Sequence, residues 1–207
     1  MQNLKDIPCL ILGIGNILWA DEGFGVRVVE AFNDKYAFTD PNNVIADGGT
    51  LGMYLYDRIC RAEKLLIFDC CDFKGKPGND DVKLWTSTKI SPHQTGMNDL
   101  LVAAAVRGAV PKEIAVVGFQ PVLLDDYGGS LSPEAKANID EAVRDGYEIV
   151  RGWNVGLRAR SEDEIAPALM DAPCLDIEQY ESGRPSAEEA CRDGDIRFAR
   201  FVAKADE

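Results

Sequence analysis

The chain has 207 residues, 46% of them hydrophobic and 28% charged, a composition typical of one globular domain with room for a short appendage. Its 22 Lys and Arg residues stand against 35 Asp and Glu residues, and the resulting net charge of −13 argues against nucleic acid or an anionic membrane surface as a partner. The six cysteines form no CxxC pair, which disfavours a zinc cage or a disulfide framework and favours reduced thiols in the cytoplasm.

The first apolar run, residues 7–20, is predicted to form a buried strand followed by a turn. A signal peptide would carry a net positive charge ahead of its apolar run, and residues 1–6 carry none. Glycines also interrupt the apolar run. It is also too short to cross a bilayer, so we expect no membrane insertion.

Short apolar runs alternate with helical patterns along the first three quarters of the chain. Strands are predicted at residues 9–14, 44–46, 65–68 and 114–119, with 82–86 as a more amphipathic fifth. Helices are predicted at 23–32, 97–106 and 132–150, the last with Ser132 as N-cap and Pro133 at the first helical position. This alternation predicts an α/β fold with a mostly parallel sheet covered by helices on both faces.

Polar residues follow three of the predicted strands, at 16–22, 47–50 and 69–72. Open parallel sheets bind their ligands beyond the carboxyl ends of the strands. We therefore expect these three clusters to face one crevice.

The composition changes after residue 153. Residues 155–207 contain 7 Lys and Arg and 13 Asp and Glu, hence −6 of the total charge, and several prolines and glycines interrupt them. We predict a main domain at 1–153 and an acidic extension at 154–207 that is partly disordered or loosely docked.

A glycine-rich turn, Gly13-Ile14-Gly15-Asn16, follows the first predicted strand. It does not fit the dinucleotide fingerprint, because Leu18 stands where the third glycine belongs and the acids after it would repel a pyrophosphate. A plain tight turn is the favoured interpretation. Asp21 and Glu22 stand at the start of the next helix, where carboxylates usually act as caps.

Two further residues could carry chemistry. Asp69 ends a buried strand, where a carboxylate can equally accept loop amides or project into the crevice. His93 is the only histidine, which excludes HExxH and three-histidine zinc sites, and no GxSxG elbow supplies a serine nucleophile. One imidazole with carboxylates suits a divalent metal such as nickel or zinc with open coordination positions, for example a metal already fixed in a partner protein.

Cys70 and Cys71 offer a competing mechanism, because a thiolate beside a histidine can act as a nucleophile. Free cysteines at a strand end more often pack as small buried hydrophobes. We favour the interpretation that Cys70 and Cys71 pack as small hydrophobic residues.

Four segments together resemble the hydrogenase maturation endopeptidases over roughly residues 7–152. They are the turn at 13–18 running into Asp21-Glu22-Gly23-Phe24-Gly25-Val26-Arg27, then Asp47-Gly48-Gly49-Thr50, then Phe68-Asp69, and finally the 89–94 segment with His93. The resemblance implies a three-layer sandwich with a twisted, mostly parallel five-stranded sheet. It also implies an endopeptidase that removes a short C-terminal extension from the nickel-loaded precursor of a nickel-iron hydrogenase large subunit.

The resemblance assigns the metal contacts to Glu22, Asp69 and His93, with nickel presented by the precursor rather than tightly bound. Glu22 is preferred to Asp21 by its register relative to Gly23 and Gly25. The family is grouped with aspartic-type peptidases, so Asp69 and Asp47 are the expected catalytic acids. A monomeric, cytoplasmic enzyme is expected.

Two other functions remain open from the residues alone. One is a nickel-sensing chaperone that docks the immature subunit without cutting it. The other is a nucleotide-dependent enzyme of similar architecture, which the acidic crevice disfavours.

Overall fold

The computed structural model describes residues 5–72, 80–84, 96–170 and 172–184. Its centre is a five-stranded sheet in the order β3-β1-β4-β6-β5, in which β5 alone runs antiparallel to its neighbour. The strands are β1 (Ile7–Ile14), β3 (Val44–Gly49), β4 (Ala62–Cys70), β5 (Asp80–Leu84) and β6 (Glu113–Phe119).

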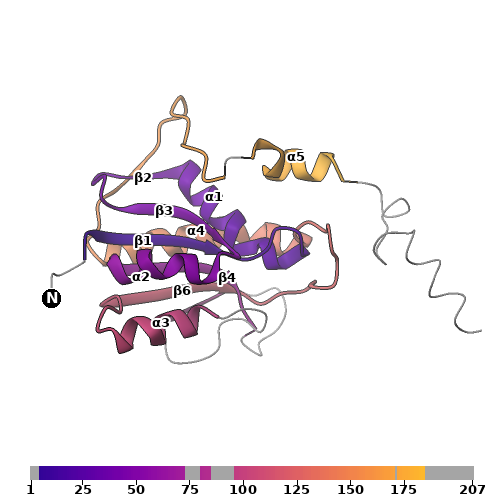
Figure 1. Ribbon diagram of the computed structural model, residues 1–207. Coiled ribbons are helices and arrows are strands. Elements are labelled where there is room, and N and C mark those ends of the chain that lie inside the picture. The colour runs from indigo at the N-terminus through magenta and orange to yellow at the C-terminus, as the bar shows by residue number, and fades with distance from the viewer. Residues whose placement is uncertain (1–4, 73–79, 85–95, 171, 185–207) are drawn as a thin grey trace, which may run out of the picture.

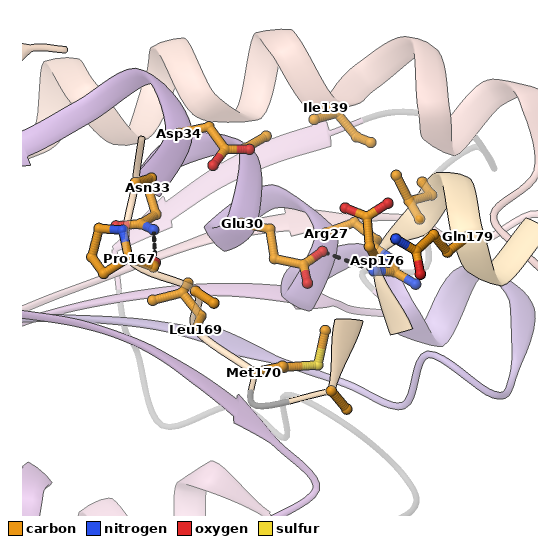
Figure 2. Close-up of a pocket in the computed structure, with 15 residues that line it drawn as sticks. Arg27, Glu30, Asn33, Asp34, Ile139, Pro167, Leu169, Met170, Asp176 and Gln179 are labelled. Atoms are coloured by element: carbon orange, nitrogen blue, oxygen red, sulfur yellow. Dashed lines mark hydrogen bonds and ion pairs between the residues drawn. The ribbon is translucent and has the colours of Figure 1, made fainter. Parts of the chain in front are cut away.

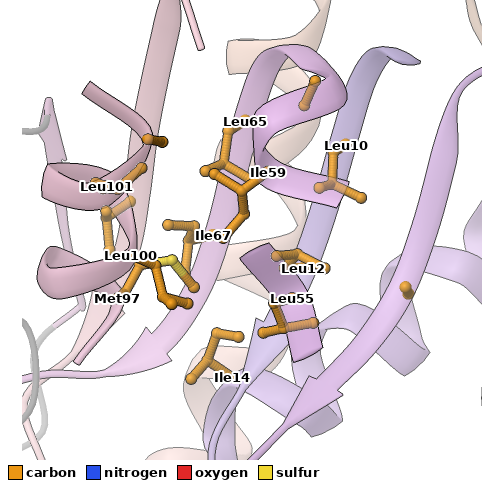
Figure 3. Close-up of a cluster of buried hydrophobic side chains, with 14 of the residues drawn as sticks. Leu10, Leu12, Ile14, Leu55, Ile59, Leu65, Ile67, Met97, Leu100 and Leu101 are labelled. Carbon is orange, nitrogen blue, oxygen red and sulfur yellow. The ribbon is translucent and has the colours of Figure 1, made fainter. Parts of the chain in front are cut away.

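The central strands read as nearly continuous apolar runs because both faces of the sheet are covered. On one face, α2 (Tyr56–Arg61) and α3 (Met97–Val106) pack over a cluster that contains Leu10, Leu65 and Ile67 (Figure 3). On the other face, α1 (Phe24–Lys35) and α4 (Pro133–Gly152) pack over Ile11, Leu66 and Phe68. The result is a three-layer α/β sandwich, visible in Figure 1 with α2 and α3 on the side of the sheet away from α1.

The predicted strands and long helices are confirmed, including the N-cap of α4. Ser132 precedes that helix, and its Oγ accepts the backbone N–H of Ala135 at 3.1 Å. The predicted α/β fold class with a mostly parallel sheet is confirmed as well.

Several short elements have no counterpart in the prediction. They are the 3-10 turns η1 (Ala20–Gly23), η2 (Gly52–Leu55) and η3 (Pro173–Leu175), together with α2, α5 (Ile177–Ser182) and a two-stranded antiparallel sheet of β2 (Tyr36–Phe38) and β7 (Leu157–Ala159). Each is too short for a periodic pattern, and β2 and β7 are defined by pairing between distant segments.

The described part of the acidic extension lies along α1 (Figure 1). Arg160 donates through Nε to the carbonyl of Asn33 (2.7 Å), Asn33 Nδ2 donates to the carbonyl of Pro167 (2.8 Å), and Arg27 donates to the carbonyl of Leu175 (2.7 Å). The domain boundary at 153/154 follows directly after the end of α4 and stays a prediction. None of the described helices is both long and apolar enough to cross a membrane.

Candidate active site

Two glycines bring the turn after β1 against the ends of the central strands. Gly15 has φ +142°, and a Cβ there would lie 1.8 Å from the carbonyl oxygen of Glu22. A Cβ on Gly25 would lie 2.2 Å from the carbonyl oxygen of Phe68 and 2.3 Å from that of Ile14. The glycine-rich turn therefore allows a close backbone approach that sets η1 beside the end of β4.

Replacing Gly25 with Ala should disturb this approach. The new methyl group must push α1 away from β4, so we expect a loss of about 1–3 kcal/mol in the free energy of unfolding and lower peptidase activity. Urea denaturation and a cleavage assay would measure both. Gly152→Ala is the matched control, because a Cβ there meets no atom within 4 Å and should leave both quantities nearly unchanged.

Asp21 organises the loop after β6. Its side chain is fully buried, and its two oxygens accept the backbone N–H groups of Val122 (2.9 Å), Leu123 (2.9 Å) and Ser132 (2.7 Å), and the Ser132 hydroxyl (3.0 Å). It therefore does not cap the helix that follows, as the sequence alone suggested: neither η1 nor α1 has a side-chain cap. With Asp21 occupied in this way, Glu22 is the neighbouring acid left for other contacts.

Asp69 ends β4 on the α2–α3 face, since Leu65 and Ile67, two and four residues earlier, belong to that core. It is 3% exposed, and its Oδ1 accepts the backbone N–H of Cys70 at 2.8 Å. Its Oδ2 is buried without a hydrogen-bond partner. Burial raises the pKa of this carboxyl well above its usual range, the Cys70 and Cys71 hydrogen bonds oppose that shift, and the nearby charge of Glu22 adds to it.

The structure therefore brings Glu22 and Asp69 together at the carboxyl end of the sheet. An unpartnered buried carboxyl oxygen is costly, and such groups concentrate where a ligand or a reaction needs them. The two acids can offer oxygen ligands to a divalent cation.

Asp47 lies elsewhere. It follows Ala46 on β3 and points to the opposite, α1-covered face, where the charges of Arg27 and Glu30 act on it. Its Oδ1 accepts the backbone N–H of Gly49 at 2.7 Å. Burial raises the pKa of Asp47, while the Gly49 hydrogen bond and Arg27 oppose the shift. The geometry does not place it with Asp69, and its catalytic role stays a prediction.

His93 lies outside the residues that the structure describes, so its expected contact with metal stays a prediction. Within the described ranges, no three His, Cys, Asp or Glu side chains gather as a metal-binding group. Glu22 and Asp69 are thus the described part of the predicted trio.

The thiols beside Asp69 are poorly suited to act as nucleophiles. Burial raises the pKa of Cys70 far above its usual value, and the negative charges of Asp69, Asp21 and Glu22 raise it further. Cys71 is buried in the apolar cluster under α2 and α3. A thiolate is the reactive form of cysteine, so the surroundings of Cys70 disfavour the thiol mechanism.

Arg27 is a buried residue that the sequence interpretation missed. Its guanidinium, only 4% exposed, pairs with Glu30 at 2.9 Å and lies 5.9 Å from the centre of the Tyr180 ring. Arg27 and Glu30 border a cavity of about 460 Å³ between α1 and the extension (Figure 2). A charged residue between Phe24 and Val28, on the apolar stripe of α1, was the available signal.

The family of the chain follows from its similarity to known proteins. A mostly parallel α/β sheet with an acidic pair at its carboxyl end is shared by many hydrolases, and the family model "Hydrogenase maturation protease" matches residues 26–149. The chain belongs to the hydrogenase maturation protease family. It is therefore a peptidase of hydrogenase maturation, and the resemblance read from its motifs is confirmed.

Several individual proteins of this family are similar to the chain over most of its length. The hydrogenase expression/formation protein HupD of Rhodobacter capsulatus is 44% identical over 99% of both chains, and HoxM of Azotobacter vinelandii is 45% identical over 91% of this chain and 93% of its own. The hydrogenase maturating endopeptidase HybD of E. coli superposes with a TM-score of 0.69 at 34% identity. That match covers 76% of this chain and 100% of HybD, so part of this chain is additional to the HybD fold.

Proposed function

We propose that this peptidase removes a short C-terminal extension from the nickel-loaded precursor of a nickel-iron hydrogenase large subunit. One observation carries the proposal beyond the family: the buried Asp69 carboxyl, with one oxygen unpartnered, lies beside Glu22 where the sheet ends. The proposed reaction takes place in the cytoplasm and is carried out by a monomer. The described cysteines Cys9, Cys60, Cys70, Cys71 and Cys174 form no disulfide, which supports that compartment.

Nickel enters this proposal as part of the substrate. Carboxylate oxygens are suitable ligands for a divalent cation, and the Oδ2 of Asp69 has no other partner among the described residues. A cation there would also favour the ionised form of Asp69, which burial and the charge of Glu22 disfavour. We propose His93 as the third ligand, by the family's motif.

Hydrolysis needs an activated water and stabilisation of the oxyanion that forms. Nickel in the precursor would supply Lewis-acid polarisation of the scissile carbonyl. Of the two carboxylates, one holds the substrate in place while the other accepts a proton from the attacking water, the role of a carboxylate in aspartic-type chemistry. Asp47 is kept as a second candidate acid, on the opposite face of the sheet.

The proposal predicts cleavage that depends on both nickel and the acidic pair. Purified enzyme would be mixed with nickel-loaded or nickel-free precursor, and intact masses would be recorded over time. We expect loss of one C-terminal peptide from the nickel-loaded precursor only, and a rate at least about a hundredfold lower for Glu22→Gln and for His93→Ala. Asp57→Asn is the matched control, since Asp57 is an exposed carboxylate on α2 paired with Arg61.

The outcomes separate the possible functions. Cleavage of both precursor forms at equal rates would remove nickel from the proposal. Unchanged mass despite a stable complex would favour the chaperone. Full activity of Glu22→Gln would remove the acidic pair from the mechanism.

A further inference from the structure

Exposed apolar side chains gather around the acidic pair. Eight large ones lie on the described segments that follow the carboxyl ends of three strands, and they include Leu18 and Trp19 after β1, Met53 and Tyr54 after β3, and Leu123 and Tyr127 after β6. Their exposed fractions range from 37% for Leu18 and Trp19 to 86% for Tyr54. We call these six residues the apolar rim.

The parts of the rim after β1 and β6 are joined to the site by backbone and ring contacts. The N–H of Glu22 donates to the carbonyl of Trp19 (2.9 Å), and the Trp19 and Tyr127 rings lie 5.1 Å apart. The N–H of Asp21 donates to the carbonyl of Leu123 (3.1 Å). Because β4 lies between β1 and β6 in the sheet, the loops after β1 and β6 flank Asp69 on its two sides.

The charges of these loops indicate the chemistry of the partner. Residues 15–23, 47–55 and 119–130 contain five carboxylates and no Lys or Arg. Asp21 is buried, Asp47 faces α1 and Asp126 pairs with Arg184 at 3.8 Å. Glu22 and Asp125 are therefore the acids that these loops leave beside the rim without an opposite charge on the same loops. An apolar surface with these acids fits a partner face that is apolar and carries cationic groups. Exposed apolar patches of this kind mark sites of protein association.

The extent of the rim favours a protein face over a short peptide. The loops follow strands β3 to β6, which span three strand spacings, about 14 Å across the sheet. The side chains are exposed over this width, whereas an extended peptide is usually held in a narrow groove or added to a sheet edge.

We propose that the apolar rim is the docking surface for the folded body of the hydrogenase precursor, which it holds while the scissile bond reaches Glu22 and Asp69. This inference rests on the proposed function, because it names the surface through which that substrate is recognised. The rim contributes to affinity and not to bond cleavage.

Two double variants, each confined to one loop, test the rim: Met53→Ser with Tyr54→Ser, and Leu123→Ser with Tyr127→Ser. Val102→Ser with Val106→Ser is the matched control, because these α3 residues are 56% and 87% exposed and precede β6 at the other end of the sheet. Thermal unfolding of all three variants would verify that each is folded.

Binding and cleavage are then measured separately on the nickel-loaded precursor. Binding is read as Kd in an Asp69→Asn background, so that it does not depend on cleavage. We expect each rim variant to raise Kd, and KM in the active background, by about tenfold or more, with kcat changed less than about twofold and the control unchanged. A peptide spanning the scissile bond should bind much more weakly than the precursor and equally to all variants.

Other results would overturn the inference. Unchanged Kd in both rim variants, or peptide binding as tight as precursor binding, removes the rim as a docking surface even if cleavage proceeds. A wild-type dimer that becomes monomeric in the rim variants would assign the rim to self-association instead. Tight, rim-dependent binding without any cleavage would uphold the docking surface and overturn the proposed function.

Discussion

Asp69→Asn is expected to abolish cleavage and at the same time to stabilise the folded protein at neutral pH. The substitution removes the ionisable group from the acidic pair, and a general base or metal contact is worth a factor of about 10²–10⁴ in rate. The amide keeps the shape of the carboxyl and retains an oxygen that can accept the Cys70 N–H. Unlike a carboxylate, it bears no charge when buried next to Glu22.

The stability gain should depend on pH in a definite direction. The pKa of Asp69 is raised in the folded state above its ordinary value of 3.8. Between those two pKa values the folded protein retains a proton that the unfolded chain has lost, so wild-type stability falls as pH rises. The advantage of Asp69→Asn is therefore smallest below about pH 4 and grows by about 1.4 kcal/mol per pH unit until the folded-state pKa is reached.

Urea denaturation of both proteins at pH 4.5 and pH 7.5 would measure this difference. Asp140→Asn is the control, because its side chain is 81% exposed and a surface change is expected to stay within about 0.5 kcal/mol. If Asp69→Asn raised the free energy of unfolding equally at the two pH values, the pKa of Asp69 would not be raised in the folded state. Retained activity would exclude it from catalysis.

Asp21→Ala should be among the most destabilising single substitutions in the chain. It leaves the buried N–H and hydroxyl of Ser132 and two part-buried backbone N–H groups without their acceptor, and each buried unsatisfied donor costs about 1–3 kcal/mol. We expect a loss of about 4 kcal/mol or more in the free energy of unfolding, a large part of the stability of an ordinary domain. Activity should fall as well, since the loop after β6 loses its anchor beside Glu22.

Two controls make this result specific. Asp125→Ala changes an exposed acid in the same loop and should alter stability by no more than about 0.5 kcal/mol. Ser132→Ala removes one of the four donors together with the α4 cap, at an intermediate expected cost of about 1–2 kcal/mol. A loss below 1 kcal/mol for Asp21→Ala would mean that water or the relaxed loop replaces the carboxylate at little cost.

Most of the fold could be predicted because its long elements carry their own signals. The apolar runs of β1, β4 and β6 and the Ser-Pro start of α4 reflect burial and capping, which act locally. β2 and β7 could not be predicted, since their three-residue pairing depends on segments about 120 residues apart in the chain. The contacts of the extension with α1 are likewise set by tertiary structure and leave no periodic pattern.

The position of the candidate site could be predicted as far as the ends of the strands could be predicted. A carboxylate at the end of a buried strand made Asp69 either a loop acceptor or a site residue, and the family resemblance favoured the second. The sheet topology places the turn after β1 beside it. The sequence could not show that Asp21 binds a loop while Glu22 does not, because the two acids are adjacent and the loop lies about a hundred residues further along the chain. Asp47 follows a predicted strand too, but the alternation of side chains along the strand turns it toward the other face of the sheet. That face could not be predicted, because the bounds of the strand were uncertain.

The partners of Asp21 also determine when the enzyme can become active during its own synthesis. Its acceptor bonds join residues 101 to 111 positions apart in the chain, and parallel pairing of β1 with β4 spans more than fifty. A nascent chain that does not yet include residue 132 lacks groups that hold the first loop in place. Such non-local contacts form slowly, so Glu22 and Asp69 are expected to come together only at a late step of folding, and an incomplete chain is expected to have no peptidase activity.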